Sequence, residues 1–164
     1  MQVRLRSVGR LAGPEPRALH VQKTVTLRAD APGLTIDYAL HNPAAWPLSI
    51  LFGVEFNFGM LAGQASDRYY RLGRETIGNF SVERDLAEVV RLELVDDWRD
   101  LCVQLDLDVA AAVWLYPVET VSVSEAGFER VYQASCVIPH WSLDLAPEAT
   151  WQVRLTLAAV AAKT

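Results

Sequence analysis

The most constraining feature of the sequence is an alternation of residue types from Trp46 to Gly59, WPLSILFGVEFNFG. Large apolar side chains occupy all its even-numbered positions: Trp46, Leu48, Ile50, Phe52, Val54, Phe56 and Phe58. A period of two puts alternate side chains on opposite faces of a β-strand, whereas a helix would distribute these aromatics around its circumference. We therefore expect one long strand with one buried face, and Trp46 in the core.

The opposite face of this expected strand is unusually bare. Ser49, Gly53 and Gly59 leave space there, and Glu55 and Asn57 project from it. Small residues within a strand often mark the close approach of a ligand or of another backbone. The simpler interpretation is that Glu55 and Asn57 face water, and periodicity alone favours that interpretation.

Turn signals divide most of the remaining chain into further alternating segments. Leu34 to Leu40 is the clearest of them, because its large apolar residues alternate with Thr35, Asp37 and Ala39. The preceding Asp30-Ala31-Pro32-Gly33 predicts a type II turn, with proline at one central position and glycine at the next. Residues 96–100 predict another turn. From Met60 to Phe80 the pattern breaks, and we expect a long connection that is functional or poorly ordered.

Roughly ten strands separated by turn signals emerge, and no segment prefers a helical spacing. The predicted fold class is all-β, a large antiparallel β-sandwich that forms a single domain over residues 1–164.

Composition excludes several classes of partner. The net charge is −5 and the basic residues are scattered, which argues against nucleic acid. No apolar run approaches the roughly 20 residues of a membrane span, and no apolar segment follows the positively charged start as in a signal peptide. We expect a soluble, cytoplasmic protein. Cys102 and Cys136 could form a disulfide, but buried free thiols are the favoured interpretation.

We find none of the common short sequence motifs of catalytic sites. There is no G-x-S-x-G nucleophile elbow and no phosphate-binding glycine loop. His20, His41 and His140 have no metal-ligand spacing, and we interpret all three as surface or hydrogen-bonded residues. We therefore predict no catalytic residue, no metal and no cofactor.

Aromatic and polar residues on predicted strands and turns are compatible with carbohydrate, because aromatic rings stack on the C–H faces of sugars while carboxylates and amides bind the hydroxyls. For any single tryptophan, filling the core is the alternative. The candidate ligand-binding residues are Glu55, Asn57, Asp97, Trp98, Trp114, Tyr116, Gln133 and Trp141.

Two segments carry a resemblance to a known family. They are LFGVEFNFGMLAG, from Leu51 to Gly63, and SEAGFERVYQASCVIPHWSLDLAP, from Ser124 to Pro147. Both resemble the C-terminal β domain of family 57 glycoside hydrolases, which include α-amylases and 4-α-glucanotransferases. The matching residues are Phe52, Gly53, Val54, Glu55, Asn57, Glu125, Gly127, Phe128, Glu129, Tyr132, Gln133, Ile138, Pro139 and Trp141.

The resemblance implies a β-sandwich of the galactose-mutarotase-like (supersandwich) kind and an association with α-glucan metabolism. In such enzymes the catalytic residues lie in an N-terminal barrel to which nothing in these 164 residues corresponds. The resemblance therefore implies a domain that is not catalytic alone.

Three functions follow as hypotheses. The first is a non-catalytic accessory or carbohydrate-binding domain for α-glucan or maltooligosaccharide. The second is a structural module that docks against a separate catalytic barrel. The third is a small sugar-active enzyme of mutarotase type, which would need an acid and a base on one face, such as Glu55 with His140 or Glu125.

Overall fold

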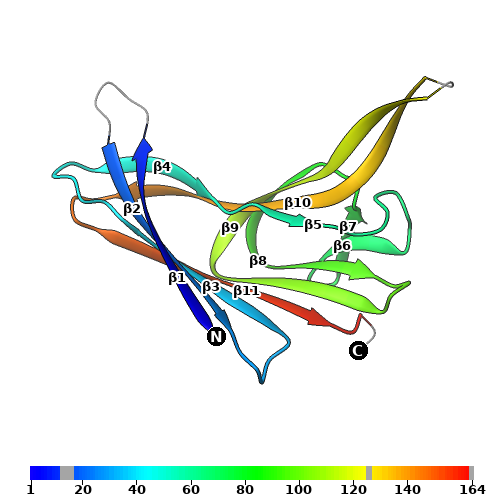
Figure 1. Ribbon diagram of the computed structural model, residues 1–164, viewed down its shortest axis with the longest axis horizontal. Coiled ribbons are helices and arrows are strands. Elements are labelled where there is room, and N and C mark those ends of the chain that lie inside the picture. The colour runs from blue at the N-terminus through cyan, green and yellow to red at the C-terminus, as the bar shows by residue number, and fades with distance from the viewer. Residues whose placement is uncertain (12–16, 125–126, 163–164) are drawn as a thin grey trace.

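The computed structural model of the protein describes residues 1–11, 17–124 and 127–162. Within those residues every regular element is a β-strand, and all pairings are antiparallel (Figure 1). This confirms the predicted all-β, antiparallel fold. The strands are β1 (Gln2–Leu11), β2 (Arg17–Leu27), β3 (Gly33–His41), β4 (Leu48–Gly53), β5 (Phe56–Phe58), β6 (Arg68–Leu72), β7 (Glu75–Asn79), β8 (Arg84–Asp96), β9 (Leu101–Ser124), β10 (Gly127–Leu145) and β11 (Thr150–Val160).

One continuous sheet folds back on itself to form two layers. The first layer follows the order β1-β2-β3-β11-β9-β8-β6-β7. The second layer is built on β10, which pairs with β9 on one side and with β4 and β5 on the other. Residues 102–107 of β9 pair with β11, and residues 112–124 pair with β10. The long strand β9 therefore passes from the first layer into the second.

Strand β8 also bends, beside β9, where β9 passes from the first layer into the second. Its register against β9 shifts on both sides of Val89, and the neighbouring Glu88 has a φ of 55°. Such bulges bend a strand and increase its twist, which allows one strand to serve both layers of a sandwich.

The hydrophobic core lies between the two layers. Phe52 on β4 stacks on Trp141 of β10 at a centroid distance of 6.1 Å. On the first layer, Phe52 meets the edges of Tyr38 on β3 and Trp151 on β11, at 5.3 and 5.9 Å. Offset and edge-to-face aromatic pairs of this kind add to the free energy of apolar burial. This aromatic cluster joins β4 and β10 to β3 and β11.

The alternation from Trp46 to Gly59 predicted the buried face correctly but not one continuous strand. Leu48 and Val54 are buried, and the phenylalanines at even positions pack partly buried against the core. The strand is nevertheless interrupted between β4 and β5, where the N–H of Val54 donates to the carbonyl of Pro139. β4 pairs with residues 140–145 of β10 and β5 with residues 135–137. The interruption falls between these two pairings.

Trp46 does not lie in the core, so that prediction is wrong: 48% of its surface is exposed. Its backbone is held by the buried Asn42, whose Nδ2 donates to the carbonyls of Trp46, Leu145 and Ala146. The chain at Trp46 is thus part of a loop that Asn42 organises, and β4 begins only at Leu48. A loop residue does not follow the period of the strand after it.

The prediction of an irregular connection from Met60 to Phe80 is wrong for β6 and β7, which form a hairpin on the edge of the first layer. Tyr70 and Phe80 are fully buried and make an edge-to-face contact at 4.9 Å. The pattern is hard to recognise because the buried strand β6 begins with a charged residue. Arg68 is buried because it pairs with Asp96 and Asp67.

The predicted type II turn before β3 is also wrong, because Gly33 lacks the positive φ that this turn requires. The N–H of Gly33 instead donates to the carbonyl of Ala31 at 2.9 Å. A Cβ at position 33 would lie 2.0 Å from the carbonyl oxygen of Leu157 on β11. Glycine is therefore required here by the close approach of another backbone.

Two further predictions are confirmed. Residues 97–100 form the turn between β8 and β9. Cys102 and Cys136 are buried free thiols on β9 and β10. Over the described residues, no helix has the length and apolarity to cross a membrane.

Candidate functional site

Two aromatic side chains of β9 project from the outer side of the second layer. Trp114 and Tyr116 alternate along β9 with the buried Val113 and Leu115. Because successive side chains of a strand point to opposite faces, both rings lie on the face away from the core. Each is 37% exposed. Each ring is therefore partly packed against its neighbours, and the exposed part is available to a ligand.

The interruption between β4 and β5 adds polar groups to the same face. Asn57 on β5 is paired with Cys136, and Cys136 is paired with Tyr116, so the three residues form one row across β5, β10 and β9. Glu55 is exposed, and Nδ2 of Asn57 donates to its Oε1 at 2.6 Å. The sequence expectation that Glu55 and Asn57 project from the outer side is met in this geometry.

A depression of about 500 Å³ lies beside the two rings, where β8 begins. Asp85 is the cross-strand partner of Trp114, and Glu83 and Arg84 line the same depression. We call the group Glu55, Asn57, Asp85, Trp114 and Tyr116 the outer aromatic face. On its other side, the ring of Trp114 is held against His140 of β10 at a centroid distance of 4.1 Å.

The phenol of Tyr116 and the thiol of Cys136 beside it stay neutral at ordinary pH. A hydrogen bond between the phenol and Cys136, together with burial, raises the pKa of Tyr116 to about 12. Burial, and to a smaller extent the negative charge of Glu55, raises the pKa of the Cys136 thiol. Tyr116 therefore offers a neutral hydroxyl next to the Glu55 carboxylate. Rings, an amide, a hydroxyl and carboxylates are the groups that sugar hydroxyls and C–H faces require.

The other predicted site residues lie elsewhere or inside. Asp97 and Trp98 belong to the turn between β8 and β9, where Trp98 is 77% exposed. Gln133 sits at a bulge of β10, and its Nε2 donates to Oγ1 of Thr120 and to the carbonyl of Val131, both at 3.2 Å. Trp141 is in the core, 6% exposed, and its indole N–H donates to the carbonyl of Ala110 at 3.0 Å.

Known proteins match nearly the whole chain. A family model described as alpha-amylase/4-alpha-glucanotransferase, C-terminal, covers residues 1–155. The chain belongs to this family. Alpha-amylase 1 of Dictyoglomus thermophilum is 32% identical over 146 residues, which are 85% of this chain and 20% of that protein. The chain thus spans about a fifth of the length of this curated relative. The resemblance inferred from the sequence is confirmed.

Solved structures agree on the fold of this C-terminal family. The crystal structure of 4-alpha-glucanotransferase from Thermococcus litoralis matches 96% of this chain with a TM-score of 0.71, at 22% identity and over 21% of that chain. A putative aldose 1-epimerase from Escherichia coli matches 98% of this chain with a TM-score of 0.70, at 14% identity and over 65% of that chain. The galactose-mutarotase-like sandwich is therefore shown for this chain as a fold.

A mutarotase-type activity would need an acid and a base, for which we considered Glu55 with His140 or Glu125. The described partner of Glu55 is Asn57. His140 has a buried Nε2 without a hydrogen-bond partner in the described structure. Glu125, the other residue considered with Glu55, lies outside the described residues. Among the residues described, no cluster of three or more His, Cys, Asp or Glu could hold a metal ion.

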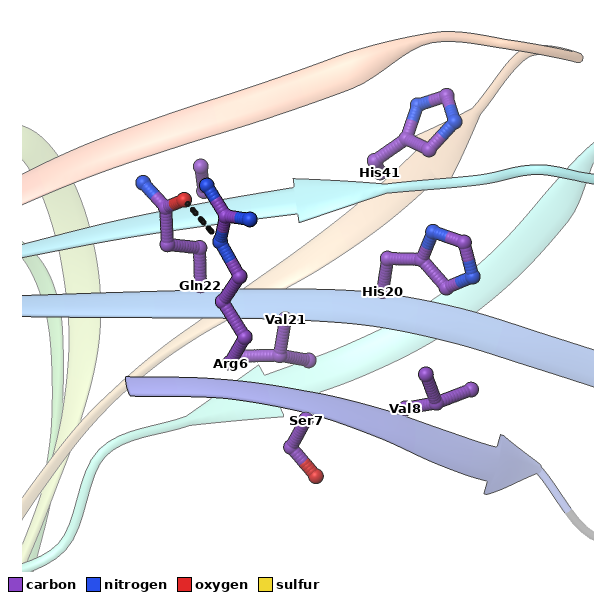
Figure 2. A pocket seen from close by; sticks show the side chains of 8 residues that line it. Arg6, Ser7, Val8, His20, Val21, Gln22 and His41 are labelled. Atoms are coloured by element: carbon purple, nitrogen blue, oxygen red, sulfur yellow. Dashed lines mark hydrogen bonds between the residues drawn. The ribbon is translucent and has the colours of Figure 1, made fainter. Parts of the chain in front are cut away.

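Sequence reasoning missed a second depression, on the outer side of the first layer (Figure 2). It has a volume of about 460 Å³ over β1, β2 and β3. His20 and His41 are directly paired across β2 and β3, with ring centroids 5.7 Å apart. The two histidines are 21 positions apart in the sequence, and only the register of the hairpin brings them together. The contact between His140 and Trp114 was not foreseen either, for the same reason, although His140 itself was considered as a partner of Glu55.

Proposed function

We propose that this chain is a non-catalytic accessory domain that binds α-glucan through its outer aromatic face. The chain belongs to the C-terminal family of α-glucan-processing enzymes, which favours a glucan as the ligand. The proposal rests on one observation in particular: Trp114 and Tyr116 are partly exposed on one face of β9, next to a hydrogen-bonded carboxylate–amide pair.

The geometry gives each group of the outer aromatic face a separate task. The ring of Trp114, held by His140, offers a rigid surface for the apolar face of a glucose unit. The carboxylate of Glu55 is oriented by Asn57 and accepts hydrogen bonds from sugar hydroxyls. Asp85 lies across from Trp114 and supplies a second acceptor on the opposite strand. This arrangement orients a sugar through stacking and hydrogen bonds.

Calorimetric titration with maltooligosaccharides tests the proposal. We expect saturable binding at millimolar or lower concentrations, with longer oligosaccharides binding more tightly than maltose because they cover both rings. Cellooligosaccharides, which present the same glucose units in a straighter chain, are the matched control. No heat of binding from any maltooligosaccharide at millimolar concentration would refute glucan binding and leave a structural domain.

A docking role is the second candidate, and a separate observation favours it. The end of the β9–β10 hairpin extends beyond the rest of the molecule as an arm (Figure 1). Val121, Val123 and Phe128 are exposed on this arm, and Val123 and Phe128 are cross-strand partners. Alternation along β9 places Val121 and Val123 on the same side as the core residue Leu115. The ion pair of Arg130 and Glu119 lies on this side as well and borders the apolar residues. An apolar patch with a charged border fits a catalytic barrel domain as the partner.

Co-purification with a catalytic domain tests the docking role separately from glucan binding. The partner is the part of alpha-amylase 1 from Dictyoglomus thermophilum that this chain does not match, produced separately. We expect Phe128→Asp to abolish capture, because a charge would enter an apolar interface. Ser122→Asp, on the opposite side of the same arm, is the control and should leave capture intact. Equal capture by wild type and Phe128→Asp would contradict a docking role for the arm.

A further inference from the structure

The first two strands differ in charge from the rest of the chain. Among the 21 residues of β1 and β2 there are five Arg or Lys and no Asp or Glu, although the whole chain has 20 acidic residues and a net charge of −5. The basic residues are Arg4, Arg6, Arg10, Arg17 and Lys23. The basic residues, which we expected to be scattered, are thus concentrated locally in these two strands. A local positive charge on an otherwise acidic protein attracts anions to that place.

The depression over β1, β2 and β3 lies on the side of these strands that carries Arg4, Arg6 and Arg10. Arg17 and Lys23 lie on the other side, where Lys23 faces the ring of Tyr38. Figure 2 shows Arg6, Val8, His20, Gln22 and His41 on one side of the three strands, while Ser7 and Val21 point to the other side. Val8 is the cross-strand partner of His20, and Arg6 is the partner of Gln22. The guanidinium of Arg6 and the two imidazoles therefore line one hollow, with Val8 and Ala39 as its apolar wall.

The hydrogen-bonding groups of this hollow are mostly free to bind a ligand. Nε of Arg6 donates to Oε1 of Gln22 at 3.1 Å, which fixes the guanidinium and leaves its terminal NH₂ groups without a partner among the described residues. His20 likewise has no hydrogen bond within the described part of the chain, only its ring contact with His41. Nδ1 of His41 lies 3.2 Å from Oγ1 of Thr150.

One acidic group opposes the positive charge. Oε2 of Glu148, in the turn before β11, lies 3.7 Å from Nε2 of His41. The next acid on the same face, Asp37 of β3, is engaged by Arg154 at 2.6 Å. Arg6, with Arg4 and Arg10 on the same side of β1, therefore leaves a net positive potential over the hollow. Its volume of about 460 Å³ is in the range of small-molecule sites.

We propose that this hollow, lined by Arg6, His20 and His41, binds a small organic phosphate such as a sugar phosphate. A guanidinium presents paired N–H donors that match phosphate oxygens, and the imidazole N–H groups add further donors. The apolar wall of Val8 and Ala39 accommodates the carbon skeleton of the ligand. This site is separate from the outer aromatic face, which lies on the other layer.

Side-chain NMR of the histidines, combined with calorimetry, tests the proposal on the complete chain. The probes are inorganic phosphate, glucose 6-phosphate and unmodified glucose. We expect both phosphates to shift the imidazole signals of His20 and His41 saturably, glucose 6-phosphate to bind more tightly than inorganic phosphate, and glucose to leave these two signals unchanged. The indole N–H signal of the buried Trp141 serves as the internal control and should not shift.

Matched variants locate the site. Arg6→Ala should weaken glucose 6-phosphate binding about tenfold or more, as expected for the loss of a charge-assisted hydrogen-bond pair. Arg4→Ala removes an equal charge from the same side of β1 without lining the hollow, and should change the affinity less than about twofold. Glu148→Gln should strengthen binding. Arg6 is exposed, so thermal unfolding is expected to be unchanged, and His20→Gln tests the hollow independently.

Three results would overturn the proposal. One is the absence of saturable shifts at His20 and His41 with either phosphate. Another is equal weakening by Arg4→Ala and Arg6→Ala, which would mean a diffuse basic surface without a defined site. The third is equal binding of glucose and glucose 6-phosphate, which would mean that the phosphate group is not recognised.

Discussion

Trp141 and Trp114 belong to neighbouring strands of the same layer, yet they face opposite sides of it. Trp141 on β10 is enclosed between the layers, stacked on Phe52, with its indole N–H bonded to a backbone carbonyl. Trp114 on β9 lies on the outer side, with more than a third of its surface exposed and its ring against His140. The inner ring is almost completely enclosed, whereas the outer ring is only partly covered by its neighbours.

This difference shows how to separate structural aromatics from candidate ligand residues in this fold. The inner cluster of Phe52, Trp141 and Trp151 joins the two layers, so its loss should reduce stability. The outer aromatic face contributes little to the packing between layers, so its loss should reduce binding. Substitutions on the inner face of the second layer should therefore reduce stability, and substitutions on its outer face should reduce binding.

The largest expected effect is on the inner side. Trp141→Ala should lower the free energy of unfolding by about 3–5 kcal/mol, because it removes a large buried ring and leaves a cavity. It also leaves the carbonyl of Ala110 without its indole donor. Chemical denaturation measures the change. A loss below about 1 kcal/mol would mean that Trp141 is not part of the core.

On the outer side, Trp114→Ala should weaken maltooligosaccharide binding about tenfold or more, the loss typical of a ring that anchors a ligand. The free energy of unfolding should fall by about 1–2 kcal/mol, less than for Trp141→Ala, because part of the ring is solvated. Calorimetry and denaturation on the same preparation give both values. Trp98→Ala is the control, since Trp98 is exposed in a turn outside the face. Loss of stability without loss of binding would contradict the division between the faces.

A smaller effect is expected at the polar pair. Glu55→Gln should weaken sugar binding severalfold, because a neutral amide is a poorer acceptor than a carboxylate. Stability should change by less than about 0.5 kcal/mol, since Glu55 is exposed. Glu75→Gln, another exposed glutamate, is the matched control for the charge. A decrease in stability of about 1–3 kcal/mol would instead identify Glu55 as a structural hydrogen-bonding residue.

The smallest effect concerns pH. The phenol of Tyr116 has its pKa raised from the usual 10 to about 12, mainly by its hydrogen bond with Cys136. The folded protein therefore holds this proton more tightly than the unfolded chain does. The resulting stabilisation is complete below pH 10 and is lost as the pH rises through about 12.

The difference in phenolate absorbance between wild type and Tyr116→Phe measures this titration. We expect its midpoint near pH 12 and a wild-type unfolding free energy that falls relative to the variant between pH 10 and 12. A midpoint near 10 would show that the contact with Cys136 is not made in solution.

Much of the fold follows from local periodicity. The alternation at residues 34–40 and 48–58 correctly predicts which side chains face the core, because the period of two is imposed by strand geometry itself. The predicted turn between β8 and β9 likewise depends on local residue types. Periodicity does not report where one strand stops, so it missed the interruption at Val54 and the exposure of Trp46. Those depend on Pro139 and Asn42, which lie outside the pattern.

The candidate site was only partly predictable for a related reason. Alternation alone selects Glu55 and Asn57 as outward, and composition selects Trp114 and Tyr116. Whether these residues share a face is decided by two registers: that of β5 on β10, which pairs Asn57 with Cys136, and that of β10 on β9, which pairs Cys136 with Tyr116. The same kind of pairing placed Trp141 inside and brought His20 to His41. Neither outcome has a signal in the one-dimensional sequence.

The indole N–H signals of the five tryptophans during a titration with maltoheptaose test the central claim most directly. If the outer aromatic face binds glucan, the signal of Trp114 should shift saturably, while those of Trp141 and Trp151 in the core and of Trp98 in the turn stay in place. A titration that leaves Trp114 unmoved, or that shifts only Trp46 or Trp98, would contradict the claim.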